Sequence, residues 1–212
     1  MKENVRKEIE KIIKEEELNC SIEDFEDKVD WYEISAHQGL SLKIIREFQD
    51  KVNWNLISQF NKLSEKFIRE FQNKVDWYQI SWEQKLSEDF IREFKGKINW
   101  LYISWKQKLS ENFIREFKNK VDWWQISIHQ SLSENFIREF KNKVDWKNIC
   151  VCQKLSENFI REFQDKVYWE SIEKYQNITK KDIEELEKQE EQKIEKELEK
   201  TRVKNKFQLI RF

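Results

Sequence analysis

Hydrophobic and polar positions repeat with a period of 23 residues through most of the chain. Each full copy starts with a leucine followed by a serine, and six such leucines are Leu40, Leu63, Leu86, Leu109, Leu132 and Leu155. A fixed period of this kind is typical of solenoid proteins, in which each repeat is a small unit that buries its apolar face against its neighbours. One repeat is therefore the unit of structure.

Within a repeat, the pattern predicts two short helices. If the leucine is position 1, apolar residues fall at positions 5, 6, 9 and 13, which share one face of a helix. Serine at position 2 favours an N-cap, and Asp or Asn at position 14 favours a second one. A second stripe follows at positions 15, 18 and 22, for example Trp123, Ile126 and Gln130. Position 11, which is Asn119 or Gly96 in two of the copies, suits the left-handed residue that closes a helix.

The charged positions and the short helices both favour stacking of repeats. Glu at position 3 precedes Arg at position 7, and Glu at 8 precedes Lys at 12, so both pairs have the favourable order for i,i+4 attraction. We expect helices of about nine or ten residues, and helices that short are marginal on their own. They gain stability only when consecutive copies pack together.

The predicted fold is therefore all-α, an α-solenoid of about seven two-helix repeats with helical caps at both ends. We expect an N-terminal capping helix at 1–16, and a charged C-terminal capping helix with a tail at 178–212. The repeats between them are 17–39, 40–62, 63–85, 86–108, 109–131, 132–154 and 155–177. The closing hexapeptide FQLIRF, 207–212, is apolar enough to dock on another surface.

The second helix has a constant side and a variable side. On a helical wheel, positions 15, 18, 19 and 22 cluster on one side, and positions 16, 17, 20 and 21 on the other. The constant residues predict the core of the solenoid. The variable residues predict an outward surface, and a solvated face without any function would vary in the same way.

The residue types at the variable positions favour a function. The candidate binding residues are Tyr78, Gln79, Trp82, Glu83, Leu101, Tyr102, Trp105, Lys106, Trp124, Gln125, Ile128, His129 and Val151. Stacked copies would align positions 16 and 20 into one apolar strip, with Trp82, Trp105 and Trp124 as anchors and polar residues at its rim. Such patches mark interaction surfaces, and Trp and Tyr are preferred anchors. Partner binding, self-association and closure against another turn of the solenoid all remain open.

Composition narrows the class of protein. The chain has no proline and only two glycines, which disfavours long loops and hairpin-rich folds. We expect no membrane association, because no apolar run reaches the 18 residues that a transmembrane helix needs. Three cysteines are an odd number, which fits reduced thiols, and the charged N-terminus lacks the apolar core of a signal peptide. These features predict a cytoplasmic protein.

Metal, cofactor and catalytic signals are weak. His129 and Cys152 occupy position 21 in successive copies, but a metal site needs three or four ligands, so we expect no metal and no cofactor. Cys150 stands at position 19, where other copies have serine, and is expected to be a small core residue. Neither a phosphate-binding loop nor a nucleophile motif is present, which predicts that the protein is not an enzyme.

Nucleic acid or a nucleotide-like ligand is an alternative partner. Residues 40–154 carry a net charge of +6, and residues 17–39 carry −6. A mildly basic array with regularly spaced aromatics could stack bases, as helical-repeat RNA readers do. Most of these lysines, however, lie in the first helix beside glutamates, away from the aromatic positions. A dedicated phosphate-binding protein usually has a larger basic excess.

The repeat frame LSExFIREFxxKVxWxxISxxQ resembles tandem repeats of uncharacterised proteins from giant DNA viruses, low-GC bacteria and phages. The resemblance covers about residues 40–177, and the frame is too specific to arise by chance. It implies a helical-repeat protein of viral or bacterial origin. It brings no activity and no ligand, so no functional residue is carried over from it.

Taken together, these patterns predict a non-enzymatic binding module that recognises a protein or peptide through the variable second-helix positions. The alternatives are a module that stacks single-stranded nucleic acid or a nucleotide-like ligand on the same tryptophans, and a structural protein that self-assembles into homo-oligomers through them.

Overall fold

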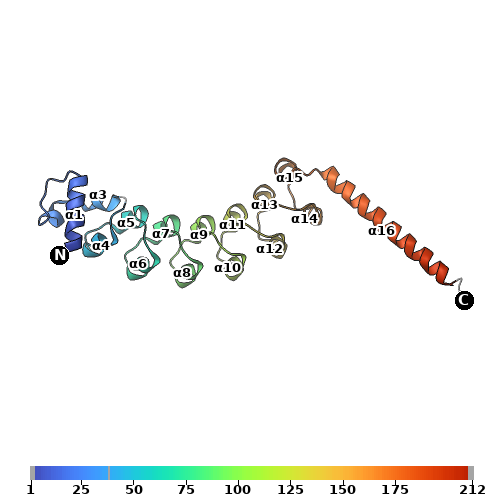
Figure 1. Ribbon diagram of the computed structural model, residues 1–212, viewed down its shortest axis with the longest axis horizontal. Coiled ribbons are helices and arrows are strands. Elements are labelled where there is room, and N and C mark those ends of the chain that lie inside the picture. Colours follow the sequence, from blue (N-terminus) through green and yellow to red (C-terminus); the bar gives the residue numbers. More distant parts are fainter. Residues whose placement is uncertain (1–2, 38, 210–212) are drawn as a thin grey trace. The chain divides into compact units, whose positions relative to one another are not determined.

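The computed structural model describes the backbone of residues 3–37 and 39–209, and all of their side chains except those at 190, 201 and 203–209. Every regular element within these residues is an α-helix. Figure 1 shows the helices along the chain. The chain divides into two compact units, residues 1–121 and 122–212. In each unit, pairs of helices repeat with the 23-residue period and contact their successive neighbours, which is the organisation of an α-solenoid. The predicted fold class is confirmed.

Unit 1 contains ten of the helices. They are α1 (Glu3–Glu15), α2 (Phe25–Lys28), α3 (Trp31–Ala36), α4 (Leu42–Glu47), α5 (Trp54–Phe60), α6 (Glu65–Glu70), α7 (Trp77–Glu83), α8 (Glu88–Glu93), α9 (Trp100–Lys106) and α10 (Glu111–Glu116). Unit 2 contains α11 (Trp123–His129), α12 (Glu134–Glu139), α13 (Trp146–Cys152), α14 (Glu157–Glu162), α15 (Trp169–Gln176) and α16 (Lys180–Leu209). Within the repeats, even-numbered helices from α4 to α14 are first helices, and odd-numbered helices from α3 to α15 are second helices.

The predicted N-cap residues of the repeat helices are present. Ser87 accepts the backbone N–H of Phe90 at the start of α8, and Asn99 accepts two N–H groups at the start of α9. Asp or Asn begins the second helices from α3 to α13 in the same way. Each cap satisfies donors that have no partner inside the helix. The cap residues therefore set where each helix starts and which way its side chains face.

Two predictions about the helix ends are wrong. The repeat helices have six or seven residues, apart from α2 with four and α15 with eight, and all are shorter than expected. Asn119 and Gly96 are not left-handed, since positive φ among the described residues occurs only at Glu17, Gly39 and Asn177. The chain instead bends at the phenylalanine of position 9, for example Phe94 with φ −107° and ψ 24°. Its carbonyl then accepts two later N–H groups in a turn, so no left-handed residue is needed.

The hydrophobic core is a row of aromatic clusters shared by neighbouring repeats. Phe90 at position 5 is fully buried, and its ring centroid lies 4.7 Å from that of Phe94. Trp77 of the preceding second helix packs 4.8 Å from Phe94 and donates its indole N–H to the carbonyl of Gln72. Such offset and tilted pairs combine a large buried area with favourable ring geometry. The tryptophan at position 15 therefore joins one repeat to the next.

A buried polar network also joins the repeats. The side chain of Gln84 donates to the carbonyls of Ser58 and Asn61, at the end of α5, and accepts the backbone N–H of Leu63. Ser58 accepts the N–H of Asp76 from the next repeat. These bonds satisfy backbone groups that the short helices leave free. Glutamine at position 22 and serine at position 19 thus belong to the interior for a specific reason.

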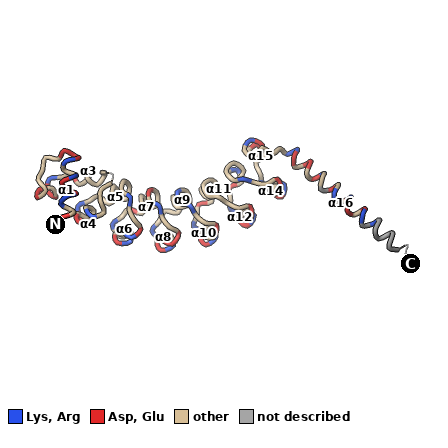
Figure 2. Tube along the Cα trace, in the orientation of Figure 1, with Lys and Arg blue, Asp and Glu red and all other residues tan. Residues whose placement is uncertain are grey.

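Ion pairs form a third connection between neighbouring repeats, and one of the two predicted pairings is replaced by another. The pair between positions 3 and 7 forms, for example between Glu65 and Arg69 at 3.6 Å. Glu at position 8, however, pairs with the position 7 arginine of the preceding repeat, as in Arg69–Glu93 at 2.7 Å. The same arginine lies over the ring of Phe90. Figure 2 shows charges of both signs gathered on first helices such as α6, α8 and α10.

The ends of the array differ from its repeats. Val5, Ile9 and Ile12 of α1 are buried, and α1 contacts α4. At the other end α16 begins as a further first helix, with Ile183 buried and contacts to α14, and then continues for 30 residues in total. The side chains of the predicted docking segment FQLIRF, and the whole of 210–212, lie outside the described residues.

Candidate functional site

Large exposed hydrophobic side chains are confined to two places in the described chain. Seven of the nine belong to second helices or their caps, namely Tyr32, Phe60, Tyr78, Leu101, Trp124, Tyr168 and Tyr175. The other two, Ile194 and Leu198, belong to α16. First helices of the repeats contribute none, because their outer faces carry the charged residues. The exposed apolar surface therefore lies at variable positions, at the cap residue Tyr168 of α15 and on the C-terminal helix.

Four aromatic residues of α7 and α9 form one continuous group in unit 1, which we call the aromatic cluster: Tyr78, Trp82, Tyr102 and Trp105. Trp82 is central, with its ring 4.7 Å from Tyr102 and 4.9 Å from Trp105, both nearly perpendicular. Tyr78 lies 4.8 Å from Tyr102, also edge to face. Edge-to-face rings attract each other through their quadrupoles. The cluster is thus organised before any partner arrives.

A hydrogen bond joins the two tyrosines at one end of the cluster. The hydroxyl of Tyr102 donates to that of Tyr78. This bond raises the pKa of Tyr102, because losing the proton would break it. The Tyr102 phenol therefore stays neutral near pH 7. Tyr78 remains 53% exposed and so presents a polar edge to a partner.

Lysines surround the other end of the cluster. The ammonium of Lys106 lies 4.0 Å from the ring centre of Trp82 and 4.7 Å from that of Trp105, which is cation–π geometry. A hollow of about 400 Å³ opens beside it, lined by Trp82, Glu83, Gln84, Lys85, Leu86, Lys106, Gln107 and Lys108. Three lysines and one glutamate border this hollow, so it favours an anionic group next to the indoles.

Local sequence explains why these side chains meet. Asp76 and Asn99 cap α7 and α9 and set the rotation of each helix. Ser81 accepts the backbone N–H of Asn99, which ties the end of α7 to the start of α9. With this offset, position 16 of one repeat faces position 17 of the next, as Tyr78 faces Tyr102. The constant residues hold the variable ones in register.

Position 17 lies deeper than the helical wheel predicts. Gln79 and Tyr102 are half-buried, and Gln125 is buried, with its side-chain oxygen lacking a hydrogen-bond partner. The prediction that Gln125 belongs to an exposed rim is wrong. Neighbouring second helices contact one another, so only part of the variable half of each helix faces outward. Glu83 and Lys106 at position 21 are exposed, as expected.

The candidate residues of unit 2 are placed separately. Trp124 is 54% exposed on α11, and His129 at the end of the same helix is also exposed. Ile128 and Val151 are half-buried. Leu101 in unit 1 is 41% exposed and stands one residue from Tyr102. The structure therefore brings four of the candidates of α7 and α9 together in the aromatic cluster, and Trp124 is an exposed indole of unit 2.

Two lysines of the site are missing from the sequence prediction. Lys85 and Lys108 stand at position 23, after the second helix, and both line the hollow beside Trp82. The sequence carries a signal for them, since Lys62 and Lys154 occupy the same position in other copies. A wheel drawn only for the helical residues cannot show that the following turn brings position 23 beside the outward face.

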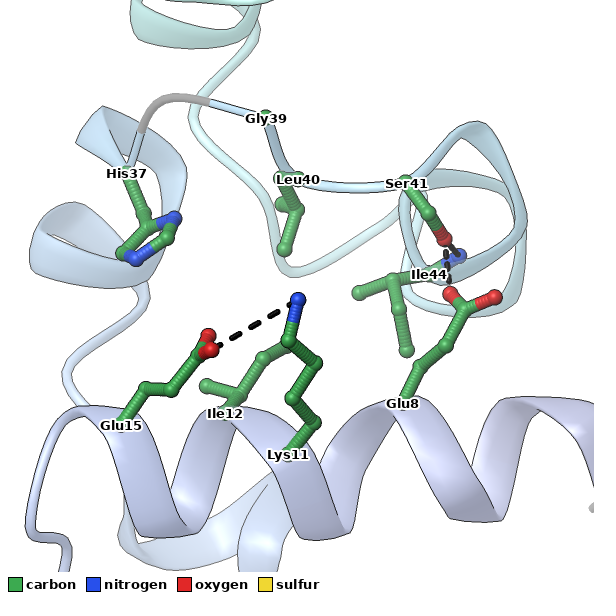
Figure 3. Close-up of a pocket in the computed structure, with 9 residues that line it drawn as sticks. All are labelled: Glu8, Lys11, Ile12, Glu15, His37, Gly39, Leu40, Ser41 and Ile44. Atoms are coloured by element: carbon green, nitrogen blue, oxygen red, sulfur yellow. Dashed lines mark hydrogen bonds and ion pairs between the residues drawn. The ribbon is translucent and has the colours of Figure 1, made fainter.

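A second hollow of about 530 Å³ lies in unit 1 between α1 and the start of α4 (Figure 3). Glu8 accepts a hydrogen bond from Ser41, and Lys11 pairs with Glu15 across its edge. Ile12, Leu40 and Ile44 form its apolar wall. Its Ser41 and Glu8 are engaged in holding α1 against α4, so the hollow is part of the N-terminal cap.

The described residues contain no group of three His, Cys, Asp or Glu placed to hold a metal ion. None of their helices is both long and apolar enough to span a membrane. Cys150 is buried, as predicted for position 19, and burial raises the pKa of its thiol.

Comparison with known proteins finds no family model, no curated protein and no solved structure that matches this chain. The resemblance of its repeat frame to viral and bacterial tandem repeats stays a prediction. Function has to be inferred from the surface itself, and the aromatic cluster with its lysine border is the most developed feature of that surface.

Proposed function

We propose that this protein is a non-enzymatic binding module that recognises a protein or peptide partner through the outward face of its second helices. The observation that carries the proposal is the aromatic cluster with Lys106 packed on two of its indoles. Preorganised Trp and Tyr side chains supply large contact area at low entropic cost, which is why they anchor protein interfaces. The binding energy would be concentrated on α7 and α9.

The ring geometry favours a polypeptide over stacked bases. A base needs the open face of an indole, and Lys106 lies over the rings of both Trp82 and Trp105. The rings of Trp82 and Tyr102 are also in T-shaped contact, with their centroids 4.7 Å apart. A peptide side chain can instead pack against the outer surface of the cluster and place a carboxylate beside the lysines that border the hollow. We therefore infer a partner segment that combines apolar and acidic residues.

Selection from a displayed peptide library tests this proposal. The full-length chain is the bait, and each selected peptide is then measured against Trp82→Ala/Trp105→Ala. We expect enrichment of peptides with apolar and acidic residues, and binding at least about 100-fold weaker in the variant, because each hot-spot anchor contributes about 2 kcal/mol or more. Circular dichroism verifies that the variant keeps its helical content.

A matched control removes two other aromatics. Tyr168→Ala/Tyr175→Ala deletes side chains that are 51% and 52% exposed in unit 2, and should leave the selected peptides bound. If the tryptophan variant loses helical content, Lys106→Glu replaces it, because this side chain is exposed and its reversal removes the cation from both indoles. Selection of no peptide, or equal affinity for all variants, would contradict the proposal.

Single-stranded nucleic acid is a second candidate, favoured by the three lysines that border the hollow beside Trp82. Its test is fluorescence anisotropy with a labelled oligothymidylate. Phosphate binding releases counterions, so affinity should fall steeply between about 50 and 200 mM salt. Weak binding, or binding that salt does not change, removes this candidate and leaves the peptide proposal in place.

A further inference from the structure

The two exposed apolar surfaces of the described chain have opposite charge. The second-helix segments 54–62, 77–85 and 100–108 of unit 1 contain four lysines and one glutamate, a net charge of +3. The segment 182–199 of α16 contains nine acidic residues and three lysines, a net charge of −6. Complementary charge steers association and selects the partner. The whole of α16 is neutral, because basic residues flank this segment at both ends. The acidic segment 182–199 in its middle has the chemistry of the partner inferred above.

The exposed face of α16 has the required composition. Ile194 and Leu198 are 60% and 57% exposed, and they stand one helical turn apart on the same side. Glu191 and Glu195 each precede one of them by three residues and so share that side. Two aliphatic side chains flanked by two carboxylates form a compact acidic-apolar surface.

Contacts within unit 2 do not bury the aliphatic pair of this surface. The first turns of α16 contact α14, and Ile183 there is buried. Glu191 and Ile194 border an open hollow of about 760 Å³ together with Arg138 and Arg161 of the same unit, and Ile194 remains mostly exposed. Leu198 lies one turn further along. Beyond its docking on α14, the helix therefore offers its aliphatic pair to an outside partner.

We propose that α16 of a second copy of this chain binds the aromatic face of unit 1, with Ile194 and Leu198 against the aromatic cluster and the neighbouring glutamates beside Lys85, Lys106 and Lys108. This inference rests on the proposed function and names one partner for that site. It joins two different surfaces of identical chains, a heterologous contact. Repeated contacts of this kind add copies head to tail and produce open assemblies unless the arrangement closes into a ring.

Sedimentation velocity on the full-length chain tests this inference through two variants that each lose one surface. Trp82→Ala/Trp105→Ala removes the receiving face, and Ile194→Gln/Leu198→Gln removes the inserting one, at exposed positions of a helix that should keep its fold. We expect the sedimenting mass of the wild-type chain to grow with concentration. Each variant alone should stay at 26.5 kDa.

Mixing the two variants gives the decisive result. Each mixed pair still has one intact receiving face and one intact inserting helix, so the mixture should form a species of two chains and stop there. Tyr168→Ala/Tyr175→Ala should assemble like the wild type. If Trp82→Ala/Trp105→Ala loses helical content, Lys106→Glu takes its place in the mixture.

Three outcomes would overturn the inference: a wild-type chain that stays monomeric at every concentration, a glutamine variant that assembles like the wild type, or a mixture that does not pair. The peptides selected above separate this failure from that of the proposed function. If the glutamine variant binds them and nothing assembles, only the inference fails. If Trp82→Ala/Trp105→Ala also binds them, the proposed function fails as well.

Discussion

The two faces of the second helices follow different rules. The inward face repeats Trp, Ile, Ser and Gln with little change, and the structure assigns each of them a task in joining one repeat to the next. The outward face changes in every copy and takes no part in the Gln–Ser network that joins the repeats. A residue with several buried partners cannot change without leaving some of them unsatisfied. The outward residues are free of this restraint, and so can carry recognition.

The largest difference should appear between the core on which the inward face packs and the outward face, when volume is removed from each. Phe113 of the first helix α10 is fully buried against Trp100 of the inward face of α9, so Phe113→Ala should lower the free energy of unfolding by about 3–5 kcal/mol. Urea unfolding followed by circular dichroism measures it. Tyr78→Ala on the outward face is the matched control and should cost far less. Equal losses in both variants would remove the distinction between the faces.

The buried glutamines should have the next largest effect. Gln84→Leu keeps a side chain of similar size in the interior. It leaves the N–H of Leu63 and the carbonyl of Asn61 without their hydrogen-bond partner. We expect a loss of about 1–3 kcal/mol, the cost of an unsatisfied buried polar group. Gln59→Leu, at a half-exposed position of α5, is the control in the same urea assay. A Gln84→Leu variant as stable as the wild type would show that the network is dispensable.

Ion pairs between first helices should contribute less, and only above a certain pH. Hydrogen bonding to Arg46 lowers the pKa of Glu70, so the pair stabilises the fold above the unfolded value near 4.5 and loses its effect as pH falls through the folded pKa. Glu70→Gln should therefore cost less than about 1 kcal/mol at pH 7, because the pair is exposed. The difference from wild type, measured by thermal unfolding, should vanish at low pH. A difference that persists in acid would assign the loss to packing.

The smallest effect is expected where one repeat departs from the inward pattern. Cys150→Ser restores the usual serine, whose hydroxyl can accept the N–H of Tyr168 that the thiol now accepts at 3.4 Å. Stability should change by less than about 0.5 kcal/mol. In the wild type, burial raises the pKa of Cys150, so iodoacetamide at pH 8 should label the exposed Cys152 much faster. Mass spectrometry measures the labelling of both cysteines. Equal labelling rates would mean that α13 unfolds locally and exposes Cys150.

Particular residues show which features of the fold could be predicted from the sequence pattern. Ser87 and Asn99 were predictable as caps, because a cap depends on the few residues beside it. Phe90 was predictable as core from its helical spacing. The left-handed residue at Gly96 was not a sound prediction, because the bend is made two residues earlier, at Phe94, whose ring is held in the core. Its backbone conformation depends on packing that no local pattern contains.

The candidate surface shows the same division. Trp82 and Trp105 could be placed on the outward side from the wheel alone. Their edge-to-face contact, the ammonium of Lys106 over both rings and the burial of Gln125 could not, because each depends on the distance between neighbouring helices. The pairing of Arg69 with Glu93 instead of within its own helix has the same origin.

The sequence by itself determined the all-helical solenoid, the phase of its repeats, the cap residues and the side of each second helix that varies. These follow from periodicity and local hydrogen bonding, which act over a few residues. The tertiary structure decided how long each helix is, which aromatic rings touch, how deep position 17 lies and where the lysines gather. These depend on the offset between adjacent repeats, which the serines, glutamines and tryptophans of the inward face set only once the copies are stacked.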